Sequence, residues 1–536
     1  MPRLAVSIRP SAMLARPARL FAGLALACTL LAASLTSAAE LRIGLSSDVT
    51  SLDPHYVNIA PNIAFAEHIF DTLVTSDAKG QLVPALAESW QAVEPTVWEF
   101  RLREGLRFSD GTPLTAADVV FSLDRPATIR NSPGPFTSYT KQIVKKEILD
   151  ERSLRLHTAT PYGPLPLDLI SIFIVSKKAA ENADTADFNR GDALIGSGPF
   201  KFESFRRGER IEITRNEHYW GEAPEWERVS FRILASGAPR LSALLAGDVD
   251  IIENVPAADL ARLKTNPQIT LAQHTSWRTL FWQLDQFRER SPFVTDHAGR
   301  PLDKNPLQDL RVRRAISKAI HRPALVDRTL EGLAVPASNL NAPGIFGYND
   351  ALAVEAYDPE GARQLLAEAG YPDGFGLTLH GPANSYINDE QVVQTVAQFL
   401  GRIGIRAQVD TQPVATYFGR ARAGEFSVAL LGWGSLAADF TLRSIVGTPD
   451  ADTGWGSWNW GRYSNPQVDE KVAAALAAGD PAEREALAGE AAGLALADLA
   501  VIPLHHQIAT GGLRQGFAYE GRVDEFTLAH QIRRAR

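Results

Sequence analysis

Every sulfur-containing residue of this 536-residue chain lies within its first 28 positions. Met1, Met13 and Cys28 are the only methionines and the only cysteine, so residues 40–536 contain neither. That long segment must fold without a disulfide, and it cannot hold a Cys-ligated zinc ion, an iron–sulfur cluster or a catalytic thiol. Its length exceeds what one hydrophobic core usually supports, so we expect two or three domains.

Residues 1–39 have the composition of a secretory signal peptide. Arginines precede an apolar run over residues 20–35, and the small residues 37–39 suit cleavage before Glu40. The apolar run is short for a membrane span and contains polar residues. The residues that precede Cys28 do not have the order of a lipoprotein signal. We therefore predict a cleaved signal peptide and a periplasmic protein without a membrane or lipid anchor.

The charge balance disfavours one class of partner. The formal net charge is −8, and residues 1–39 carry arginines but no acidic residue, so the rest of the chain is more acidic still. Nucleic-acid-binding proteins need a basic surface to neutralise phosphates. We therefore expect no nucleic acid partner.

Segments typical of strands and helices alternate along residues 40–536, which predicts a mixed α/β protein. The segments with strand patterns are residues 41–45, 97–103, 211–214, 377–380, 406–409 and 501–504. Helices are expected after Thr115 and Asp309 and over residues 359–369, 390–400, 466–478 and 481–499. The third of these has both ends marked, because Asp358 and Pro359 suit a helix start and Gly370 suits a helix end.

Motifs of the common catalytic classes are missing from the sequence. It contains no phosphate-binding loop, no Gly-x-Ser-x-Gly elbow, no Gly-x-Gly-x-x-Gly and no His-Glu-x-x-His. His505 and His506 are adjacent, and adjacent side chains on a strand point to opposite faces, so we expect one inward and one outward histidine rather than a metal site. We predict no catalysis, no cofactor and no metal; a triad scattered along the chain stays open.

Glycines and tryptophans cluster in the second half of the chain. Trp433 lies between Gly432 and Gly434, and Asp439 follows closely. Further tryptophans interleaved with glycines are Trp455, Trp458 and Trp460. Such a segment suits a ligand cleft, where aromatic faces and a few polar groups hold a small molecule. Ordinary core packing explains the same residues equally well, and the composition leaves both interpretations open.

Residues 98–121 read WEFRLREGLRFSDGTPLTAADVVF. This segment resembles the family 5 solute-binding proteins of bacterial ABC importers, the dipeptide, oligopeptide and nickel group. Further segments resemble the family in the same order: SLDP at 51–54, LVPALAESW at 82–90, GSGPF at 196–200, NEHYW at 216–220, RVRRAISKAIHR at 311–322 and LLAEAGYPDGF at 365–375. The resemblance extends from about residue 40 to the end of the chain.

The resemblance implies an α/β fold of the periplasmic binding protein type II kind, a two-lobed clamp with an extra inserted domain. Lobe 1 would be discontinuous, with residues 40–69, 197–280 and 498–536. The inserted small domain would span residues 70–196, and lobe 2 residues 281–497. Clamps of this kind bind a ligand between the lobes and close over it by a hinge motion.

The resemblance also implies a function. The protein would be the extracytoplasmic substrate-binding component of an ABC importer that captures a peptide or peptide-like solute. It would act as a monomer, deliver the solute to a membrane permease with a cytoplasmic ATPase, and need no cofactor. The alternatives are a binding protein for a nickel chelate or another non-peptide solute, such as an opine or a sugar-like compound, and a secreted hydrolase.

Two departures from the family pattern bear on the ligand. Peptide binders of the family often hold the peptide ammonium with an Asp three residues after the tryptophan of the Gly-Trp loop, and that position here is Leu436. Asp439 is the alternative partner, because a buried ammonium left unpaired costs several kcal/mol. Dipeptide binders also use an arginine for the peptide carboxylate, and residues 382–389 contain none. Larger peptides, conjugates and amino-acid derivatives therefore stay open.

The predicted ligand-binding residues are Trp433, Gly434, Ser435, Asp439, Asn384, Tyr386 and His55. Trp433 would supply an aromatic face, and Gly434 and Ser435 would supply backbone or hydroxyl contacts. We interpret the motif at residues 98–121 as structural.

Overall fold

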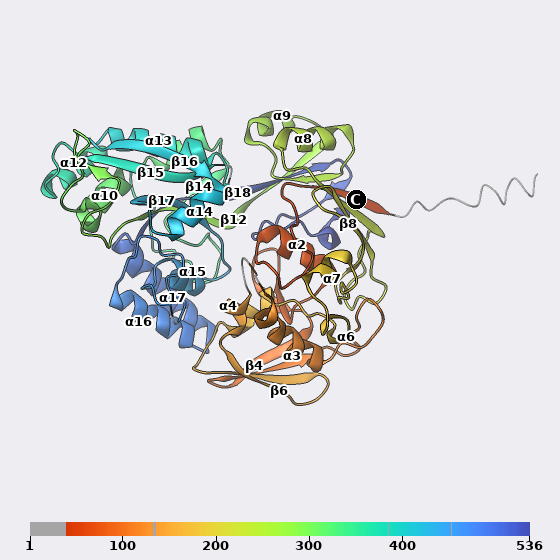
Figure 1. Cartoon of the computed structure of the whole chain (residues 1–536). Coiled ribbons are helices and arrows are strands. Elements are labelled where there is room, and N and C mark those ends of the chain that lie inside the picture. Colours follow the sequence, from red (N-terminus) through yellow and green to blue (C-terminus); the bar gives the residue numbers. More distant parts are fainter. Residues whose placement is uncertain (1–38, 131, 133–135, 384, 452, 536) are drawn as a thin grey trace, which may run out of the picture.

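The structure is a computed structural model that describes residues 39–130, 132, 136–383, 385–451 and 453–535. Residues 1–38, which hold nearly all of the predicted signal peptide, lie outside the described residues. Figure 1 shows two bodies side by side, connected by two long strands. We call residues 39–268 and 515–535 the first body and residues 285–500 the second body.

One sheet of 12 strands runs through both bodies. Its strands are β1 (Glu40–Leu45), β8 (Phe200–Arg206), β9 (Arg210–Arg215), β10 (Arg228–Ile233), β11 (Ile251–Glu253), β12 (Ile269–Leu284), β13 (Val294–Thr295), β14 (Ala334–Pro336), β15 (Gly376–Ala383), β16 (Arg406–Pro413), β17 (Val428–Trp433) and β18 (Val501–Arg514). The order is β13-β15-β17-β12-β18-β11-β1-β10-β9-β8, with β14 beside β18 and β16 beside β15. The long antiparallel pair β12 and β18 therefore links the two bodies.

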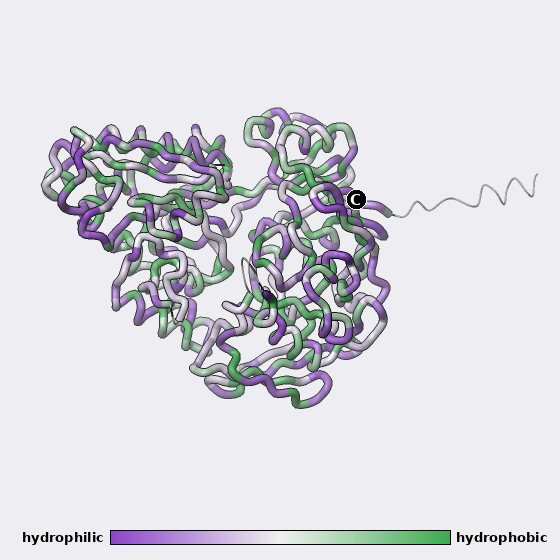
Figure 2. The backbone as a smooth tube through the Cα atoms, in the orientation of Figure 1, coloured by the Kyte–Doolittle hydropathy of each residue, from purple (hydrophilic) through white to green (hydrophobic). Residues whose placement is uncertain are grey.

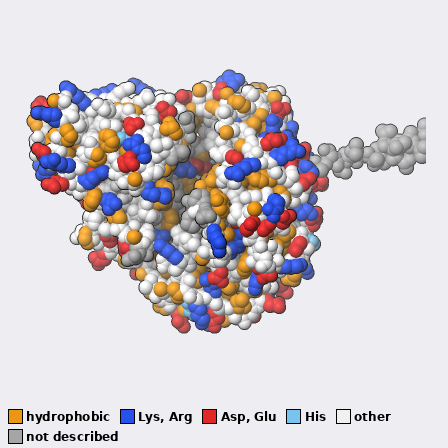
Figure 3. Space-filling view, in the orientation of Figure 1, with side chains coloured by type: hydrophobic (Ala, Val, Ile, Leu, Met, Phe, Trp, Pro, Cys, Tyr) orange, Lys and Arg blue, Asp and Glu red, His pale blue; other side chains and the backbone are white. Residues whose placement is uncertain are grey.

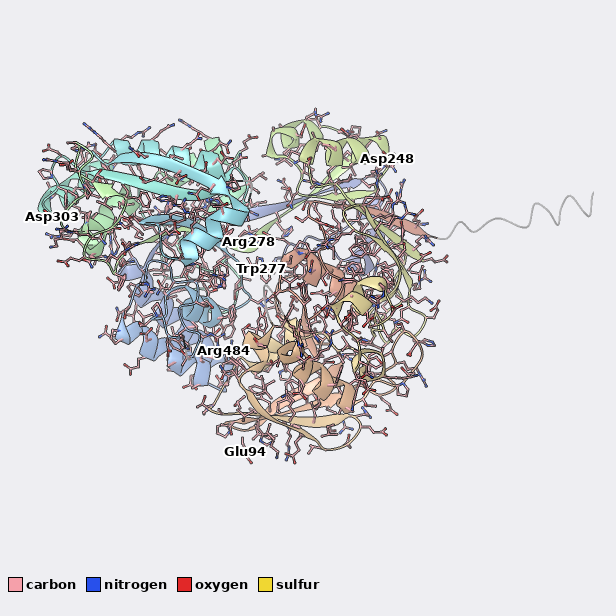
Figure 4. The ribbon with its side chains drawn as sticks, viewed as in Figure 1. Glu94, Asp248, Trp277, Arg278, Asp303 and Arg484 are labelled. Atoms are coloured by element: carbon pink, nitrogen blue, oxygen red, sulfur yellow. The ribbon has the colours of Figure 1, made fainter. Side chains whose placement is uncertain are left out.

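The pairing of β12 with β18 is interrupted where the chain passes between the bodies. The register shifts between Thr275 and Thr279 and again between Leu280 and Phe281. Such irregularities bend a strand and redirect its side chains. The residues at the first shift include Trp277, which lies between the two bodies (Figure 4).

A separate antiparallel sheet occupies the first body. Its strands are β4 (Ala87–Glu94), β5 (Val97–Leu102), β6 (Ile143–Ile148) and β7 (Ser153–Thr158), in the order β4-β5-β7-β6. The motif at residues 98–121 forms β5, a turn and most of α3 (Ala116–Asp124), which starts with a capping box between Thr115 and Asp118. Phe100 and Phe108 are buried in the core beneath it, so this motif holds the fold together.

The remaining helices cover the sheets. Those of the first body are α2 (Ala60–Ile69), α4 (Thr137–Thr140), α5 (Leu165–Asp168), α6 (Lys177–Ala180), α7 (Thr185–Arg190), α8 (Gly237–Ala246) and α9 (Leu260–Leu263). Those of the second body are α10 (Leu310–Ala319), α11 (Arg322–Ala324), α12 (Pro359–Glu368), α13 (Asp389–Gly401), α14 (Val414–Arg422), α15 (Ala438–Ile445), α16 (Pro466–Ala477) and α17 (Pro481–Ala497). Short strands complete the first body: β2 (Val74–Ser76), β3 (Leu82–Pro84), β19 (Phe517–Ala518) and β20 (Arg533–Arg534).

Hydrophobic and hydrophilic residues are interspersed along most of these elements (Figure 2), so each can bury one apolar side. The ends of α12 are as predicted: the Asp358 side chain accepts the backbone N–H of Gly361, and Gly370 follows with a φ of 93°. None of the helices in the described part of the chain is long and apolar enough to cross a membrane.

The helix α2 is held by a close approach of two glycines. The backbone N–H of Gly198 donates to the Ile69 carbonyl at 3.0 Å. A Cβ at Gly196 would lie 1.9 Å from the same carbonyl oxygen, and a Cβ at Gly198 2.7 Å from its carbon. Only glycine fits at these two positions, which fixes the end of α2 against the segment that leads into β8.

The prediction of one inward and one outward histidine at positions 505 and 506 is wrong. Both side chains are buried, because β18 is covered on both faces where it passes between the bodies. His506 Nδ1 lies 2.8 Å from Thr279 Oγ1. Burial lowers the pKa of His505 to about 3 and that of His506 to about 4, so both rings are neutral at pH 7.

Candidate ligand-binding site

A cavity of about 220 Å³ is lined by residues of both bodies. Figure 3 shows a groove between the two bodies on the surface. The first body contributes residues of α2, β2, α4 and α5 to its wall. The second body contributes residues 434–436 and Phe440. Trp277, at the irregularity of β12, and Phe526, in the C-terminal segment, also line the cavity. A space enclosed by both bodies is where a hinged clamp holds its solute.

The loop that follows β17 reaches the cavity, and its residues Gly434 and Ser435 line the wall. A Cβ at Gly434 would lie 2.5 Å from Trp277 Nε1, so only glycine allows the indole to pack here. The Ser435 hydroxyl is engaged within its own turn, where it donates to the Ala437 carbonyl at 3.0 Å and accepts the Ala437 N–H. Whether either residue touches a ligand stays a prediction.

Trp433 lies behind the cavity wall. It stacks on Phe440 with ring centroids 6.1 Å apart, and Phe440 in turn stacks on Tyr139 of the first body at 6.3 Å. Trp458 also packs against Trp433, with ring centroids 5.6 Å apart. Tyr139 and Phe440 line the cavity and Trp433 does not, so the predicted tryptophan supports the aromatic wall from within the second body.

Asp439 is completely buried. Its carboxylate accepts a hydrogen bond from Arg484 Nε at 2.6 Å and another from the backbone N–H of Phe440 at 2.7 Å. Arg484 belongs to α17, on the side of the second body nearer the first (Figure 4). The carboxylate therefore has a cation already, which favours a structural role over the predicted contact with a solute ammonium.

Two more predicted residues do not line the cavity. The Tyr386 hydroxyl accepts the backbone N–H of Gly432 at 2.9 Å, so Tyr386 braces the end of β17. His55 is buried in the first body, where Nε2 lies 2.9 Å from the Phe173 carbonyl and burial lowers its pKa to about 3. Asn384 lies outside the described residues.

Sequence reasoning missed the charged part of the wall. Among the described residues, three carboxylates line the cavity, those of Glu67, Asp168 and Asp524, and no lysine, arginine or histidine does. Asp168 accepts the Tyr162 hydroxyl at 2.6 Å, and burial raises its pKa to about 6 against the opposing charge of Arg443. The sequence did contain a signal for Glu67, because it is the one acidic residue in the largely apolar segment 60–70.

A second cavity, of about 230 Å³, adjoins the first and shares Asp524 and Phe526 with it. It lies mainly in the first body, where Glu253 accepts hydrogen bonds from the backbone and hydroxyl of Ser46. Arg278 lines it and forms an ion pair with Glu525 at 2.8 Å. Within the described ranges, no three His, Cys, Asp or Glu side chains lie close enough together to hold a metal ion.

Comparison with known proteins identifies the class. A model of the bacterial extracellular solute-binding proteins, family 5 Middle, matches residues 81–445. The glutathione-binding protein GsiB of Escherichia coli strain K12 is 28% identical over 481 residues, which cover 87% of this chain and 88% of GsiB.

Solved structures match over nearly the whole chain. The periplasmic binding protein DppA of Helicobacter pylori in complex with the peptide STSA has a TM-score of 0.75 and 24% identity, covering 93% of this chain and 98% of DppA. AgaA of A. tumefacien R10 in complex with agropinic acid has a TM-score of 0.74 and 25% identity, covering 93% of this chain and 99% of AgaA.

The fold and the cavity between the bodies are those of a two-lobed type II periplasmic binding protein with an extra inserted region, which confirms the predicted fold class. The chain belongs to the bacterial extracellular solute-binding proteins, family 5. It is the substrate-binding component of an ABC importer, and its relatives named above are binding proteins.

Proposed function

We propose that the protein captures a small peptide-like or amino-acid-derived solute in the cavity between the bodies and delivers it to a membrane permease with a cytoplasmic ATPase. The observation that carries this proposal is the cavity itself, which is lined from both bodies and bordered by the connecting strand β12. Its volume of about 220 Å³ lies below the about 300–1,000 Å³ of typical drug-sized sites, which favours a short solute over a long peptide.

The relatives support the same solute class. Glutathione, the peptide STSA and agropinic acid are the ligands in the names of the three relatives compared above, and the first two are small peptides. A nickel chelate is the second candidate, because NikZ from Campylobacter jejuni, in complex with Ni(L-His), has the same fold with a TM-score of 0.75.

For the domains, we propose that the boundaries stand as predicted, with lobe 1 at residues 40–69, 197–280 and 498–536, the inserted domain at 70–196 and lobe 2 at 281–497. The pairing of β12 with β18 would be the hinge, since these strands alone carry the main sheet from one body to the other.

For the site, we propose direct solute contacts for Gly434 and Ser435, which line the cavity. Trp433 and Tyr386 would support that wall from behind. Asp439, with its own arginine, would be structural. Asn384 stays a predicted contact, and His55 would be structural because it is enclosed in the first body.

For the cellular setting, we propose cleavage of residues 1–39 and a periplasmic location. We also propose that the protein acts as a monomer without nucleic acid, cofactor or catalysis. Membership of a family of bacterial extracellular proteins supports the location.

Native mass spectrometry of freshly purified protein tests the proposed function, since a closed clamp often retains its solute. We expect an added mass that denaturation releases, followed by calorimetric binding of short peptides, glutathione or opines. Chromatography of the solute after long incubation is the check on catalysis. The proposal is overturned if none of these compounds binds, or if the solute is converted to products.

A further inference from the structure

The wall contributed by α2 carries an acidic side chain without a partner. The Glu67 carboxylate accepts no hydrogen bond and forms no ion pair with any described residue. Glu67 borders both the cavity between the bodies and a smaller cavity of about 120 Å³ behind α2. A carboxylate in such surroundings is costly unless a cation or several donors reach it.

Arg522, whose charge acts on Glu67, already has hydrogen-bond partners of its own. Arg522 is buried and donates to both carboxylate oxygens of Asp524 from Nε, at 3.0 and 3.1 Å. Its remaining nitrogens donate to the Ser76 carbonyl at 3.2 Å and to Gln531 Oε1 at 3.3 Å. Glu67 is therefore a further acid at this end of the cavity, and Arg522 forms no ion pair with it.

The other charges around Glu67 have the same sign as Glu67. Asp71, at the end of α2, is held by Ser197 and Trp220. Burial raises the pKa of Glu67 to about 8; Arg522 opposes this shift, while Asp524 and Asp71 add to it. One guanidinium thus faces three carboxylates at this end of the cavity.

The rest of the wall suits a cation. The opposite loop, residues 434–436, carries no charge, and aromatic rings of Tyr139, Trp277 and Phe440 line the space. Aromatic faces attract ammonium and guanidinium groups. A second group also lacks its partner here: the Trp277 indole N–H is buried without an acceptor, although buried indoles usually have one.

We propose that Glu67 is the counter-charge for a cationic group of the solute, a primary ammonium or a guanidinium held between α2 and the loop of residues 434–436. The proposal rests on the proposed function and narrows its solute class to compounds with a positive group and a nearby hydrogen-bond acceptor. Zwitterionic amino-acid derivatives have both.

The test compares matched ligands and matched variants. Calorimetric affinities are measured for short peptides and glutathione, each with a free amine and as its N-acetyl form, on the wild type, Glu67→Gln and the control Glu94→Gln. Glu94 is exposed at the far end of β4 (Figure 4), so its variant keeps wild-type behaviour.

We expect the wild type and Glu94→Gln to prefer the free amines by about 30-fold or more, the range for removing one partner of a buried charge pair. Glu67→Gln should bind both forms within a few-fold of each other. Equal binding of both forms by the wild type overturns the proposal without any variant, and so does a preference that Glu67→Gln retains. If the wild type binds none of the compounds, the proposed function fails together with this inference.

Discussion

The two walls of the cavity differ in charge. The wall of the first body carries carboxylates, of which Glu67 has no partner in the described part of the protein. The wall of the second body presents residues 434–436 and the Phe440 ring, while the nearby acid Asp439 is paired with Arg484 and does not line the cavity. On our proposal, this difference assigns recognition of the solute's charge to the first body and recognition of its shape to the second body.

Among the variants that test this contrast, Asp439→Asn has the largest expected effect on stability. The change leaves Arg484 with a buried charge and no carboxylate, so we expect a loss of about 3–5 kcal/mol in unfolding free energy. Urea unfolding measures it. The double variant Asp439→Leu with Arg484→Met, which removes both charges, should recover much of the loss. A fully stable Asp439→Asn variant with weakened solute binding would place the charge recognition in the second body instead.

Gly434→Ala tests shape on the second wall. The added Cβ would lie 2.5 Å from Trp277 Nε1, so it must displace the indole. Overpacking usually costs about 1–3 kcal/mol in stability, and we expect the displaced indole to weaken solute binding as well. Titration with the solute found by mass spectrometry measures the effect. Gly489→Ala is the matched control, because nothing lies within 4 Å of its added Cβ. Equal affinities for the two variants would show that the close contact at Gly434 does not shape the site.

The pH dependence of stability tests charge on the first wall. Burial raises the pKa of Glu67 to about 8 from an ordinary 4.5, so the folded protein keeps a proton that the unfolded chain releases. The stabilisation present below pH 4.5 is then lost as the pH rises toward 8, by at most about 1.4 kcal/mol per pH unit. Gln mimics the neutral acid, so the stability of Glu67→Gln relative to the wild type should grow between pH 5 and pH 8. Thermal melts at both values check this, and a constant difference would contradict it.

Tyr386→Phe gives the smallest expected effect. It removes the acceptor of the Gly432 N–H behind the second wall, at a cost of about 1 kcal/mol in stability. Because Tyr386 is not part of the cavity lining, solute affinity should change only a few-fold. Loss of binding in a folded Tyr386→Phe protein would show that this residue contacts the solute directly.

Local signals predicted much of the fold. Asp358 and Gly370 mark the ends of α12, and the capping box of Thr115 with Asp118 starts α3, because both depend on residues only a few positions apart. The resemblance at residues 98–121 led to the two-lobed clamp, which the family match confirms.

The site was harder to predict because distant segments assemble it. Spacing alone placed Asp439 near the Gly-Trp loop, but α15 turns its side chain toward Arg484, 45 positions further along the chain. Trp277 reaches the cavity at an irregularity in the pairing of β12. The sequence around it contains no glycine, proline or asparagine that would predict such an irregularity. Both histidines of β18 are buried because neighbouring elements cover the two faces of that strand, which the alternation rule cannot foresee.

A crystal structure of the protein with the solute that it retains on purification tests the central claim most directly. We predict that the solute lies between α2 and the loop of residues 434–436, with its cationic group within hydrogen-bond distance of the Glu67 carboxylate. A solute bound outside this cavity, or one that turns an apolar or anionic group toward Glu67, would contradict the division of roles between the two walls.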